Sequence, residues 1–375
     1  MRPSTTARPL LTIAALDIRR DIVKGFEYFS YFHPRIVYAH NPYDDLYADE
    51  YGPDMLPAAN FRDMCQKLWQ TPPALLQLFE PFSLRYLPQL LILTALARRR
   101  HTPIFLVTFE NHPLACHGRL GEWLLRVGLP PLFSAALLII YLNDGARRNV
   151  LSCGPYANKL SRHMYGTWGV DLNEFSPAAN GLEPPLPTIL FVGRLHPQKG
   201  IFDLLTAFGL VSAQIPAAQL IFVGDGPARN ELAQEISARG WTDRVHLAGK
   251  LYNRDLPPVF RNATVFCAPS VTDVRWEEQV GMTNIQAMAC GLPVVSTLSG
   301  AIPEYVPDGV AGILTPEHDP AALAQALIRL LTDSDLRRQM GQAGRRYAVE
   351  HYDIAGNVRA VENVLRQALT TGGTA

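Results

Sequence analysis

Two cations, Arg194 and Lys199, are the most chemically informative feature of this 375-residue sequence. They follow the apolar run Ile189–Val192, which predicts a buried strand that ends at Gly193, and they precede a helix expected to begin near Ile201. Both cations would then lie at the carboxyl edge of a parallel sheet, where open α/β sheets bind ligands. A guanidinium can grip phosphate oxygens with two parallel hydrogen bonds, and an ammonium adds a compact charge. The segment therefore suits a diphosphate, although strand-to-helix turns also carry solvated cations without a function.

A second segment brings a carboxylate and a helix start together. A strand is expected to end before Pro269, a loop to present Glu278, and a helix to begin close to Thr283. Free N–H groups at a helix start favour an anion, so this loop could hold phosphate from the side opposite the two cations. Gly291 and Pro293 then end the helix and begin the next strand. The alternative is that Glu278 is a solvated loop carboxylate.

The two segments, in this order, resemble the C-terminal domain of the group 1 glycosyl transferases (glycosyltransferase family 4), which have the GT-B architecture. The matching motifs are G-R-L-x-x-x-K-G, V-G-D-G-P, P-S, A-M-A-C-G-L-P-V-V and S-G-x-x-P-E, which begin at Gly193, Val223, Pro269, Ala287 and Ser299. Residues 169–177 also resemble the family segment G-V-D-x-x-x-F-x-P, which closes the first domain. The resemblance is specific over residues 165–315 and weak before them.

The resemblance implies an α/β fold of two Rossmann-like domains, whose parallel sheets face each other across a cleft. It also implies retaining transfer of a sugar from a nucleoside diphosphate sugar to a glycan, lipid or small-molecule acceptor, with no cofactor and no required metal. Arg194 and Lys199 would neutralise the leaving diphosphate, and Glu278 would touch the donor sugar or its phosphates. Further donor contacts are expected from Gly193, Gly224, Gly226, Gly281, Met282, Thr283, Asn284 and Gln286. Polysaccharide or glycolipid assembly in the cytoplasm is the implied setting.

The sequence departs from the family pattern in two places. The family's E-x7-E pair is here Glu278 and Gln286. A glutamine can still accept a hydrogen bond from a ribose hydroxyl, but its amide becomes a donor, so donor affinity or nucleotide preference would change. The glycine-rich loop expected after the first strand is also missing, because residues 11–20 contain no glycine and the next one is Gly25.

In the first half of the chain, polar residues follow the predicted strand that ends at Thr108. Family members commonly place a His two residues after such a Thr; here that position is Glu110, with Asn111 and His112 beyond it. These three residues are candidates for sugar or acceptor contacts, or they are loop residues at an exposed strand end. Glu80 follows another predicted strand and is a weaker candidate.

Strand and helix patterns alternate in two series, which is typical of parallel sheets. The first series comprises Leu11–Leu16, Arg35–Ala39, Leu75–Phe79, Ile104–Thr108 and Leu137–Leu142, and ends near 162–168. The second comprises Thr188–Val192, Gln219–Val223, Arg244–Ala248, Thr264–Ala268, Pro293–Thr297 and Gly312–Thr315. We therefore predict an acceptor-side domain over residues 1–175, a proline-rich linker over 176–187, a donor-binding domain over 188–350, and a final helix over 351–375 that crosses back to the first domain.

Composition excludes several classes of function. Lys and Arg together number 34, as do Asp and Glu, so no global field draws the chain to nucleic acid. The five cysteines are scattered and contain no C-x-x-C pair, which argues against a disulfide framework and against a zinc site.

Three apolar segments are too short to span a membrane. They are Leu10–Leu16, Leu84–Ala97, which Arg98–Arg100 follow, and Leu129–Leu142, which contains Pro130 and Pro131. We interpret the second and third segments as a buried helix and a buried strand. The alternative is a basic, apolar patch that makes peripheral contact with an anionic membrane surface at the inner face of the cell membrane.

Two other functions fit parts of the sequence. A Rossmann dehydrogenase would need a glycine at position 229 to complete G-x-G-x-x-G after Gly224, but that residue is Arg229, and Pro227 lies inside the turn. A catalytically silent nucleotide-sugar-binding or scaffold protein is the remaining alternative, motivated by Gln286 and the missing glycine-rich loop. Turnover of a nucleotide sugar would distinguish a glycosyltransferase from this silent protein.

Overall fold

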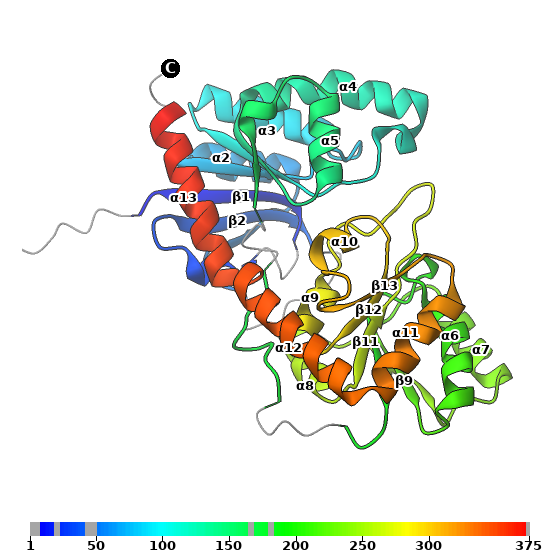
Figure 1. Ribbon diagram of the computed structural model, residues 1–375. Coiled ribbons are helices and arrows are strands. Elements are labelled where there is room, and N and C mark those ends of the chain that lie inside the picture. The colour runs from blue at the N-terminus through cyan, green and yellow to red at the C-terminus, as the bar shows by residue number, and fades with distance from the viewer. Residues whose placement is uncertain (1–7, 19–22, 42–50, 164–168, 179–183, 373–375) are drawn as a thin grey trace, which may run out of the picture. The chain divides into compact units, whose positions relative to one another are not determined.

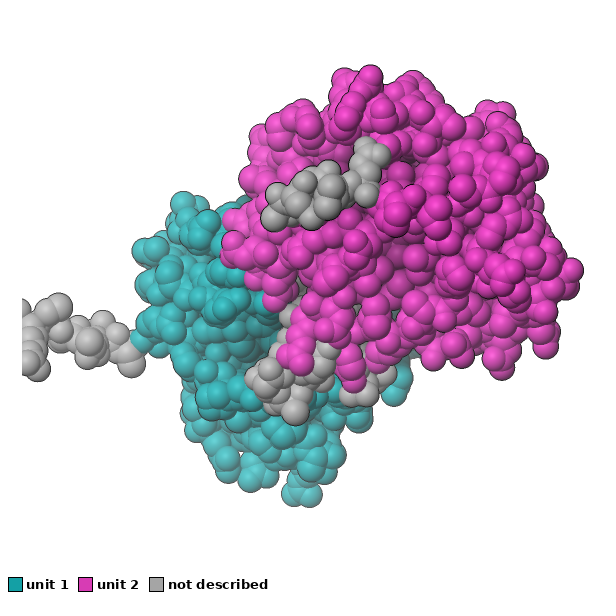
Figure 2. Space-filling view, turned by 90° about the horizontal axis from the view of Figure 1, so that it is seen from below, with its two compact units in different colours: residues 1–169, 354–375 teal, residues 170–353 magenta. Residues whose placement is uncertain are grey.

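The chain forms two compact units in the computed structural model (Figure 1). Unit 1 comprises residues 1–169 and 354–375, and unit 2 comprises residues 170–353 (Figure 2). The structure describes residues 8–18, 23–41, 51–163, 169–178 and 184–372. Each unit contains one sheet whose neighbouring strands all run parallel, which confirms the two predicted α/β series.

The sheet of unit 1 has seven strands in the order β3-β2-β1-β4-β5-β6-β7. Their bounds are β1 Leu10–Asp17, β2 His33–His40, β3 Met55–Pro57, β4 Leu75–Phe79, β5 Ile104–Thr108, β6 Ala136–Tyr141 and β7 Leu160–Arg162. The sequence reading missed β3 and β7, because three residues are too few to show a strand pattern.

The helices of unit 1 cover both faces of this sheet. They are α2 Phe61–Gln70, α3 Leu87–Arg99, α4 Gly118–Ala135, α5 Asp144–Ser152 and α13 Ile354–Gly372, with short 3-10 turns η1 Phe26–Tyr28, η3 Leu114–His117 and η4 Ala157–Lys159. On one face α2, α3 and α4 bury Met64, Leu90 and Leu125 in the main core of the unit. On the other face a smaller core contains Ile13 and Ile36.

The interpretation of residues 129–142 as a buried strand is wrong for its first half. Residues 129–135 complete α4, and the strand begins only at Ala136. Leu125, Leu129 and Leu132 recur at helical spacing and are buried, so continuing the helix buries a row of apolar side chains. This burial offsets the loss of two backbone donors at Pro130 and Pro131, which lie inside the helix.

A buried carboxylate fixes the last helix to unit 1. Glu362 of α13 is 2% exposed, and its carboxylate accepts hydrogen bonds from the backbone N–H groups of Ser30 (3.1 Å), Tyr31 (2.7 Å) and Phe32 (2.9 Å) and from the Ser30 hydroxyl (2.6 Å). Burial by itself raises the pKa of Glu362, but the hydrogen bonds from these three residues outweigh it and lower the pKa below its usual range. The charged form of Glu362 is therefore the one that holds α13.

The sheet of unit 2 has six strands in the order β10-β9-β8-β11-β12-β13. Their bounds are β8 Thr188–Val192, β9 Gln219–Val223, β10 Val245–Gly249, β11 Val265–Ala268, β12 Val294–Thr297 and β13 Gly312–Thr315. These are the six strands predicted for the second series, with ends that differ by at most one residue. All five residues of β8 are buried, as expected for a central strand of a parallel sheet.

The helices of unit 2 follow the strands in alternation. They are α6 Ile201–Gln214, α7 Arg229–Ala238, α8 Leu256–Arg261, α9 Met282–Ala289, α10 Ile302–Tyr305, α11 Pro320–Thr332 and α12 Ser334–His351, with 3-10 turns η6 Pro197–Lys199 and η7 Asn253–Asp255. Helices α6, α7 and α11 pack on one face of the sheet, and α9 packs against β11 and β12. Of the predicted linker 176–187, the described ends contain no helix or strand; residues 179–183, and residues 164–168 at the predicted end of the first series, lie outside the described residues.

Candidate active site

The strand order of unit 2 reverses between β8 and β11. The chain moves outward from β8 to β9 and β10, and then returns to pair β11 with the other edge of β8. A crevice outside the carboxyl ends of two such strands is where open α/β sheets bind ligands. The loop after β8 carries Arg194 and Lys199, and the loop after β11 carries Glu278, so both predicted segments meet at this point.

Lys199 and Glu278 form an ion pair at the reversal. Lys199 Nζ lies 2.7 Å from Glu278 Oε2, and the two side chains are only 27% and 13% exposed. The Ser270 hydroxyl donates to the same carboxylate oxygen at 2.7 Å. Burial raises the pKa of Glu278, but the charge of Lys199 and the hydrogen bonds from Lys199 and Ser270 outweigh it, so the pKa lies below its usual range. The pair is therefore charged and largely shielded from water.

Glycine 200 permits the close approach of the two loops. Its backbone is left-handed (φ 66°), and a Cβ atom there would clash with the carbonyl oxygen of Pro269. Gln198 adds further ties, because its carbonyl accepts from Val271 N–H at 2.8 Å and its side-chain amide donates to Asp273. The conformation of the β8 loop thus places Lys199 beside the start of the β11 loop.

Trp276 also contacts the lysine. Lys199 Nζ lies 4.4 Å from the centroid of the Trp276 ring, which is the geometry of a cation–π interaction. The sequence motifs gave Trp276 no role. Its position two residues before Glu278 was the only signal for it.

Arg194 is exposed and lies two residues after the end of β8. Its neighbour Leu195 is buried, and Leu195 N–H donates to the Asp225 carbonyl at 2.9 Å, which ties the loop after β8 to the loop after β9. The two glycines of V-G-D-G-P serve this contact, since Cβ atoms at Gly224 and Gly226 would clash with the carbonyl oxygens of Gly193 and Leu195.

Helix α9 brings two buried amides to the same region. It begins at Met282, one residue before the predicted Thr283, after Gly281 in a left-handed conformation (φ 73°). Asn284 and Gln286 are 1% and 6% exposed. Neither Asn284 Oδ1 nor Gln286 Oε1 has a hydrogen-bond partner among the described residues, which is costly for buried carbonyl oxygens. Both oxygens are suited to accept hydrogen bonds from a ligand.

Three further polar residues support the β11 loop and were missed. Thr272 Oγ1 donates to Glu317 Oε1 at 2.9 Å and lies 3.0 Å from Ser299 Oγ. Ser299 opens the motif S-G-x-x-P-E, so a signal for it was present, whereas Thr272 and Glu317 belong to no recognised pattern. Together they hold the loop that carries Trp276 and Glu278.

The candidates of unit 1 lie after β5 and are held by two asparagines. Asn143 Nδ2 donates to the Phe109 carbonyl at 2.7 Å, and Asn149 Nδ2 donates to the carbonyls of Glu110 (2.8 Å) and His112 (2.9 Å). The Glu110 carboxylate itself accepts from the His112 N–H at 3.0 Å, and the neighbouring Asn111 is buried. The segment is thus a loop whose backbone is fixed by hydrogen bonds.

Glu80, the weaker candidate, has a structural contact. Its carboxylate accepts from the Phe109 N–H at 2.9 Å, and its backbone is left-handed (φ 46°). At the end of β1, the strand beside β4, Asp17 accepts a hydrogen bond from the Tyr86 hydroxyl at 2.7 Å. The carboxyl ends of β1 and β4, where the strand order of unit 1 reverses, therefore each carry a carboxylate that accepts a hydrogen bond.

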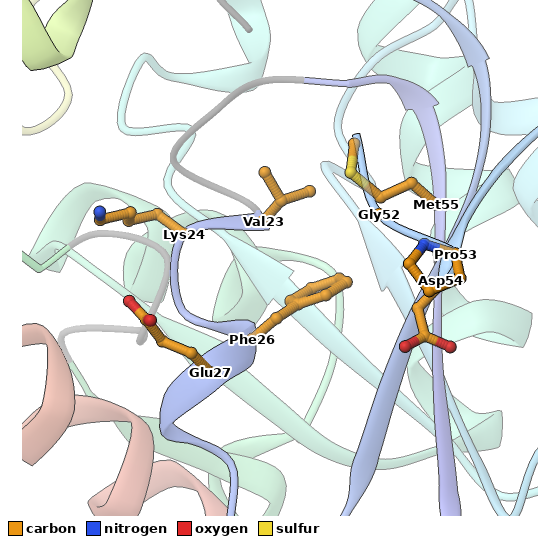
Figure 3. Close-up of a pocket in the computed structure, with 8 residues that line it drawn as sticks. All are labelled: Val23, Lys24, Phe26, Glu27, Gly52, Pro53, Asp54 and Met55. Atoms are coloured by element: carbon orange, nitrogen blue, oxygen red, sulfur yellow. The ribbon is translucent and has the colours of Figure 1, made fainter. Parts of the chain in front are cut away.

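A cavity of about 350 Å³ lies elsewhere in unit 1 (Figure 3). It is lined by apolar and charged residues, namely Val23, Lys24, Phe26, Glu27, Gly52, Pro53, Asp54 and Met55. None of the predicted site residues lines it. Within the described part of the chain, no group of three His, Cys, Asp or Glu side chains is placed to bind a metal ion. No helix of that part is long and apolar enough to cross a membrane.

A known protein family matches most of unit 2. Residues 173–347 match the family model described as glycosyl transferases group 1. An alpha-maltose-1-phosphate synthase of Mycolicibacterium smegmatis is 29% identical over 259 residues, which are 63% of this chain and 64% of the synthase. A D-inositol 3-phosphate glycosyltransferase of Salinispora arenicola is 34% identical over 202 residues, which are 48% of this chain and 44% of that enzyme. The aligned part thus spans less than two thirds of either relative.

Comparison with solved structures extends over both units. HepE of Anabaena, solved in complex with UDP and glucose, has a TM-score of 0.76 to this chain at 18% identity, and the match covers 96% of this chain and 100% of HepE. Together with the two parallel sheets, this likeness confirms the predicted class of two Rossmann-like domains.

Proposed function

We propose that this chain, which matches the group 1 glycosyltransferases over residues 173–347, transfers a sugar from a nucleoside diphosphate sugar to an acceptor hydroxyl with retention of configuration. The observation that carries the proposal is the shielded Lys199–Glu278 pair at the reversal of strand order in unit 2. A lysine fixed at this point can meet a phosphate without first being ordered, which is the electrostatic preorganisation that departure of a diphosphate needs.

Arg194 and Lys199 are the proposed partners of the leaving diphosphate. The exposed guanidinium lies two residues after β8, and the ammonium lies five residues further along the same loop. As the bond between the sugar and the diphosphate breaks, negative charge grows on the phosphate oxygens, and both cations stabilise it. Glu278 holds the ammonium in place before the donor binds and touches the donor sugar or its phosphates afterwards.

The nucleoside is proposed to lie beside helix α9. The carbonyl oxygens of Asn284 and Gln286 are buried without partners and can accept hydrogen bonds from ribose hydroxyls. Backbone N–H groups at Met282 and Thr283, at the start of α9, favour the diphosphate. The remaining proposed donor contacts are the backbone positions Gly193, Gly224, Gly226 and Gly281.

The proposed reaction requires no nucleophile from the protein. The acceptor oxygen attacks the anomeric carbon on the face from which the diphosphate leaves, and a phosphate oxygen takes the acceptor proton. We propose that the transfer uses no metal, because the two cations supply the positive charge. Acceptor contacts are assigned to Glu110, Asn111 and His112, and the acceptor is a glycan, a lipid or a small molecule. A cytoplasmic setting in polysaccharide or glycolipid assembly fits the family.

The test is release of nucleotide from a panel of UDP-, GDP- and ADP-sugars incubated with glycan and lipid acceptors. The proposal predicts release from at least one donor, with the anomeric configuration of the product, measured by NMR, the same as in the donor. Binding of UDP, GDP or ADP without release from any donor would instead support a silent nucleotide-sugar-binding protein. An inverted product would contradict the proposed attack.

A further inference from the structure

Helix α4 of unit 1 has two apolar faces, and only one of them is buried. Leu125, Leu129 and Leu132 pack into the core of the unit. The opposite side of the helix carries large apolar side chains that are exposed to 70, 58, 43 and 56% of their area, namely Leu120, Trp123, Leu124 and Val127. Their spacing of three and four residues places them on one stripe along the helix, within an arc of about 100°.

The stripe is unusual for the surface of this chain. Large exposed apolar residues elsewhere, such as Leu210 on α6 and Val349 on α12, lie singly on their helices. Single exposed apolar residues are ordinary, whereas several that adjoin one another mark a surface that another body covers. Helix α4 lies beside α3 in the outer helical layer of unit 1, where such a body could reach it (Figure 1).

The part of the sequence that contains the stripe is strongly basic. Residues 81–163 contain ten Lys and Arg against three Asp and Glu, a net charge of +7, in a chain whose total charge is zero. Within α4, Arg119 and Arg126 lie along one side of the stripe, and Arg126 pairs with Glu122 at 2.8 Å. The positive charge of the chain is therefore concentrated in the region that carries the exposed apolar stripe.

We infer that α4 is a membrane-binding surface that lies on an anionic lipid bilayer. An apolar stripe that contains a Trp and is flanked by Arg is the pattern of a helix that lies in the plane of a bilayer interface. The net positive charge complements anionic headgroups, and each basic side chain near such a surface adds to the attraction. This surface is not formed by either of the apolar segments that the sequence reading considered, since its exposed residues lie between them.

The position of α4 also bears on the acceptor, in a way that rests on the function proposed above. The stripe begins eight residues after His112, and η3 links the two. A bilayer on α4 would therefore present its headgroups to the same region of unit 1 as Glu110, Asn111 and His112. The surface favours an acceptor that is carried by a lipid.

Sedimentation of the full chain with vesicles tests the surface independently of catalysis. The parent should bind vesicles of equimolar phosphatidylcholine and phosphatidylglycerol, bind vesicles of phosphatidylcholine alone much more weakly, and dissociate as salt is added. The double variant Leu120→Ser, Val127→Ser should lower the partition coefficient by about tenfold or more. Arg119→Gln should lower it by about fivefold. Leu210→Ser, the same type of substitution at an exposed residue of unit 2, should have no effect.

A second measurement locates the contact. Brominated lipids should quench part of the tryptophan fluorescence of the parent, and the change Trp123→Phe should remove that part. The inference is overturned if the parent ignores anionic vesicles, or if the double variant binds them as well as the parent does. It is also overturned if the parent is a dimer in solution and the double variant a monomer, because a second copy would then cover the stripe. Nucleotide release by the variants, measured with a water-soluble acceptor, should remain at the parent level.

Discussion

Two buried carboxylates, Glu278 in unit 2 and Glu362 in unit 1, are both held in the charged form, but by different partners. Glu362 accepts hydrogen bonds from the backbone N–H groups of residues 30–32 and from the Ser30 hydroxyl, which are all groups of unit 1. Glu278 is held by the Ser270 hydroxyl and by the ammonium of Lys199, which has three donors. The partners of Glu362 are a serine hydroxyl and backbone groups of residues 30–32, whereas Lys199 can donate to a ligand while Glu278 holds it in place.

The same contrast separates the two points where strand order reverses. In unit 1 the ends of β1 and β4 carry Asp17 and Glu80, which bind a tyrosine hydroxyl and a backbone N–H. In unit 2 the ends of β8 and β11 lead to Arg194, Lys199 and Glu278. The described residues at the two reversals thus present carboxylates in unit 1 and cations with a balancing carboxylate in unit 2, while residues 19–22, which follow β1, lie outside the described residues. The function proposed above assigns the donor to unit 2, where the two cations would attract a diphosphate.

Removing either cation is the strongest way to break this contrast. We expect Lys199→Ala and Arg194→Ala each to lower turnover by about 100-fold or more, the effect of deleting one preorganised charge-stabilising group. The matched control is Lys250→Ala, since Lys250 is an exposed lysine of unit 2 whose ammonium faces the Tyr252 ring. Steady-state assays of nucleotide release measure the effect, and activity of the Lys199 or Arg194 variant within a few-fold of the parent would remove its assigned role.

Neutralising Glu362 tests the structural half of the comparison. Glu362→Gln should destabilise unit 1 by about 2 kcal/mol near neutral pH, because hydrogen bonds to a charged acceptor are replaced by bonds to a neutral one. The folded-state pKa of Glu362 is lowered, so its stabilisation is present above the unfolded pKa of about 4.3 and is lost as pH falls through the folded value.

Urea unfolding measures this prediction at two pH values. The gap between parent and Glu362→Gln should narrow from neutral pH to about pH 3. A gap that is unchanged in acid would mean that the charge of Glu362 is not what anchors α13. Turnover at neutral pH, under folded conditions, should stay close to that of the parent.

Restoring a carboxylate at position 286 sharpens the account of the nucleoside. If the Gln286 carbonyl accepts from ribose, Gln286→Glu should change nucleoside diphosphate affinity by about tenfold, because a hydrogen bond to a charged acceptor is stronger. Calorimetry of UDP, GDP and ADP binding measures it, with Gln214→Glu at the exposed end of α6 as the control. Unchanged affinity for all three nucleotides would count against a ribose contact.

The smallest effect is expected at Trp276. Trp276→Ala should lower kcat by about fivefold while leaving the fold intact, because a cation–π contact at a partly exposed site is worth about 1 kcal/mol. Trp276→Phe keeps an aromatic face and should recover most of the loss. Equal losses in both variants would show that packing, and not the contact with the Lys199 ammonium, is what matters.

Local sequence patterns predicted the sheet of unit 2 well. Buried runs such as Thr188–Val192 are long enough to identify, and glycines such as Gly193 mark where they end. The contact between Lys199 and Glu278 was not predictable from the residues alone, since 79 positions separate them in the chain. The motifs placed both residues at one sheet edge, but the close approach depends on Gly200 lying against the Pro269 carbonyl.

Unit 1 was less predictable for physical reasons. Its short edge strands carry little pattern. Pro130 and Pro131 argue against a helix over the second half of α4, but burial of its leucines offsets the cost of the prolines. The anchoring of Glu362 joins a helix to residues 330 positions earlier and involves backbone donors, which leave no mark in the sequence. The exposed face of α4 also escaped notice, because an apolar helix pattern does not reveal which of two faces is buried.

The most direct test of the central claim is a crystal structure of the chain with a nucleoside diphosphate bound. The account predicts phosphate oxygens within about 3 Å of both Lys199 Nζ and the Arg194 guanidinium, with the nucleoside beside the Gln286 carbonyl. A diphosphate bound elsewhere, with Lys199 still directed only at Glu278, would contradict it.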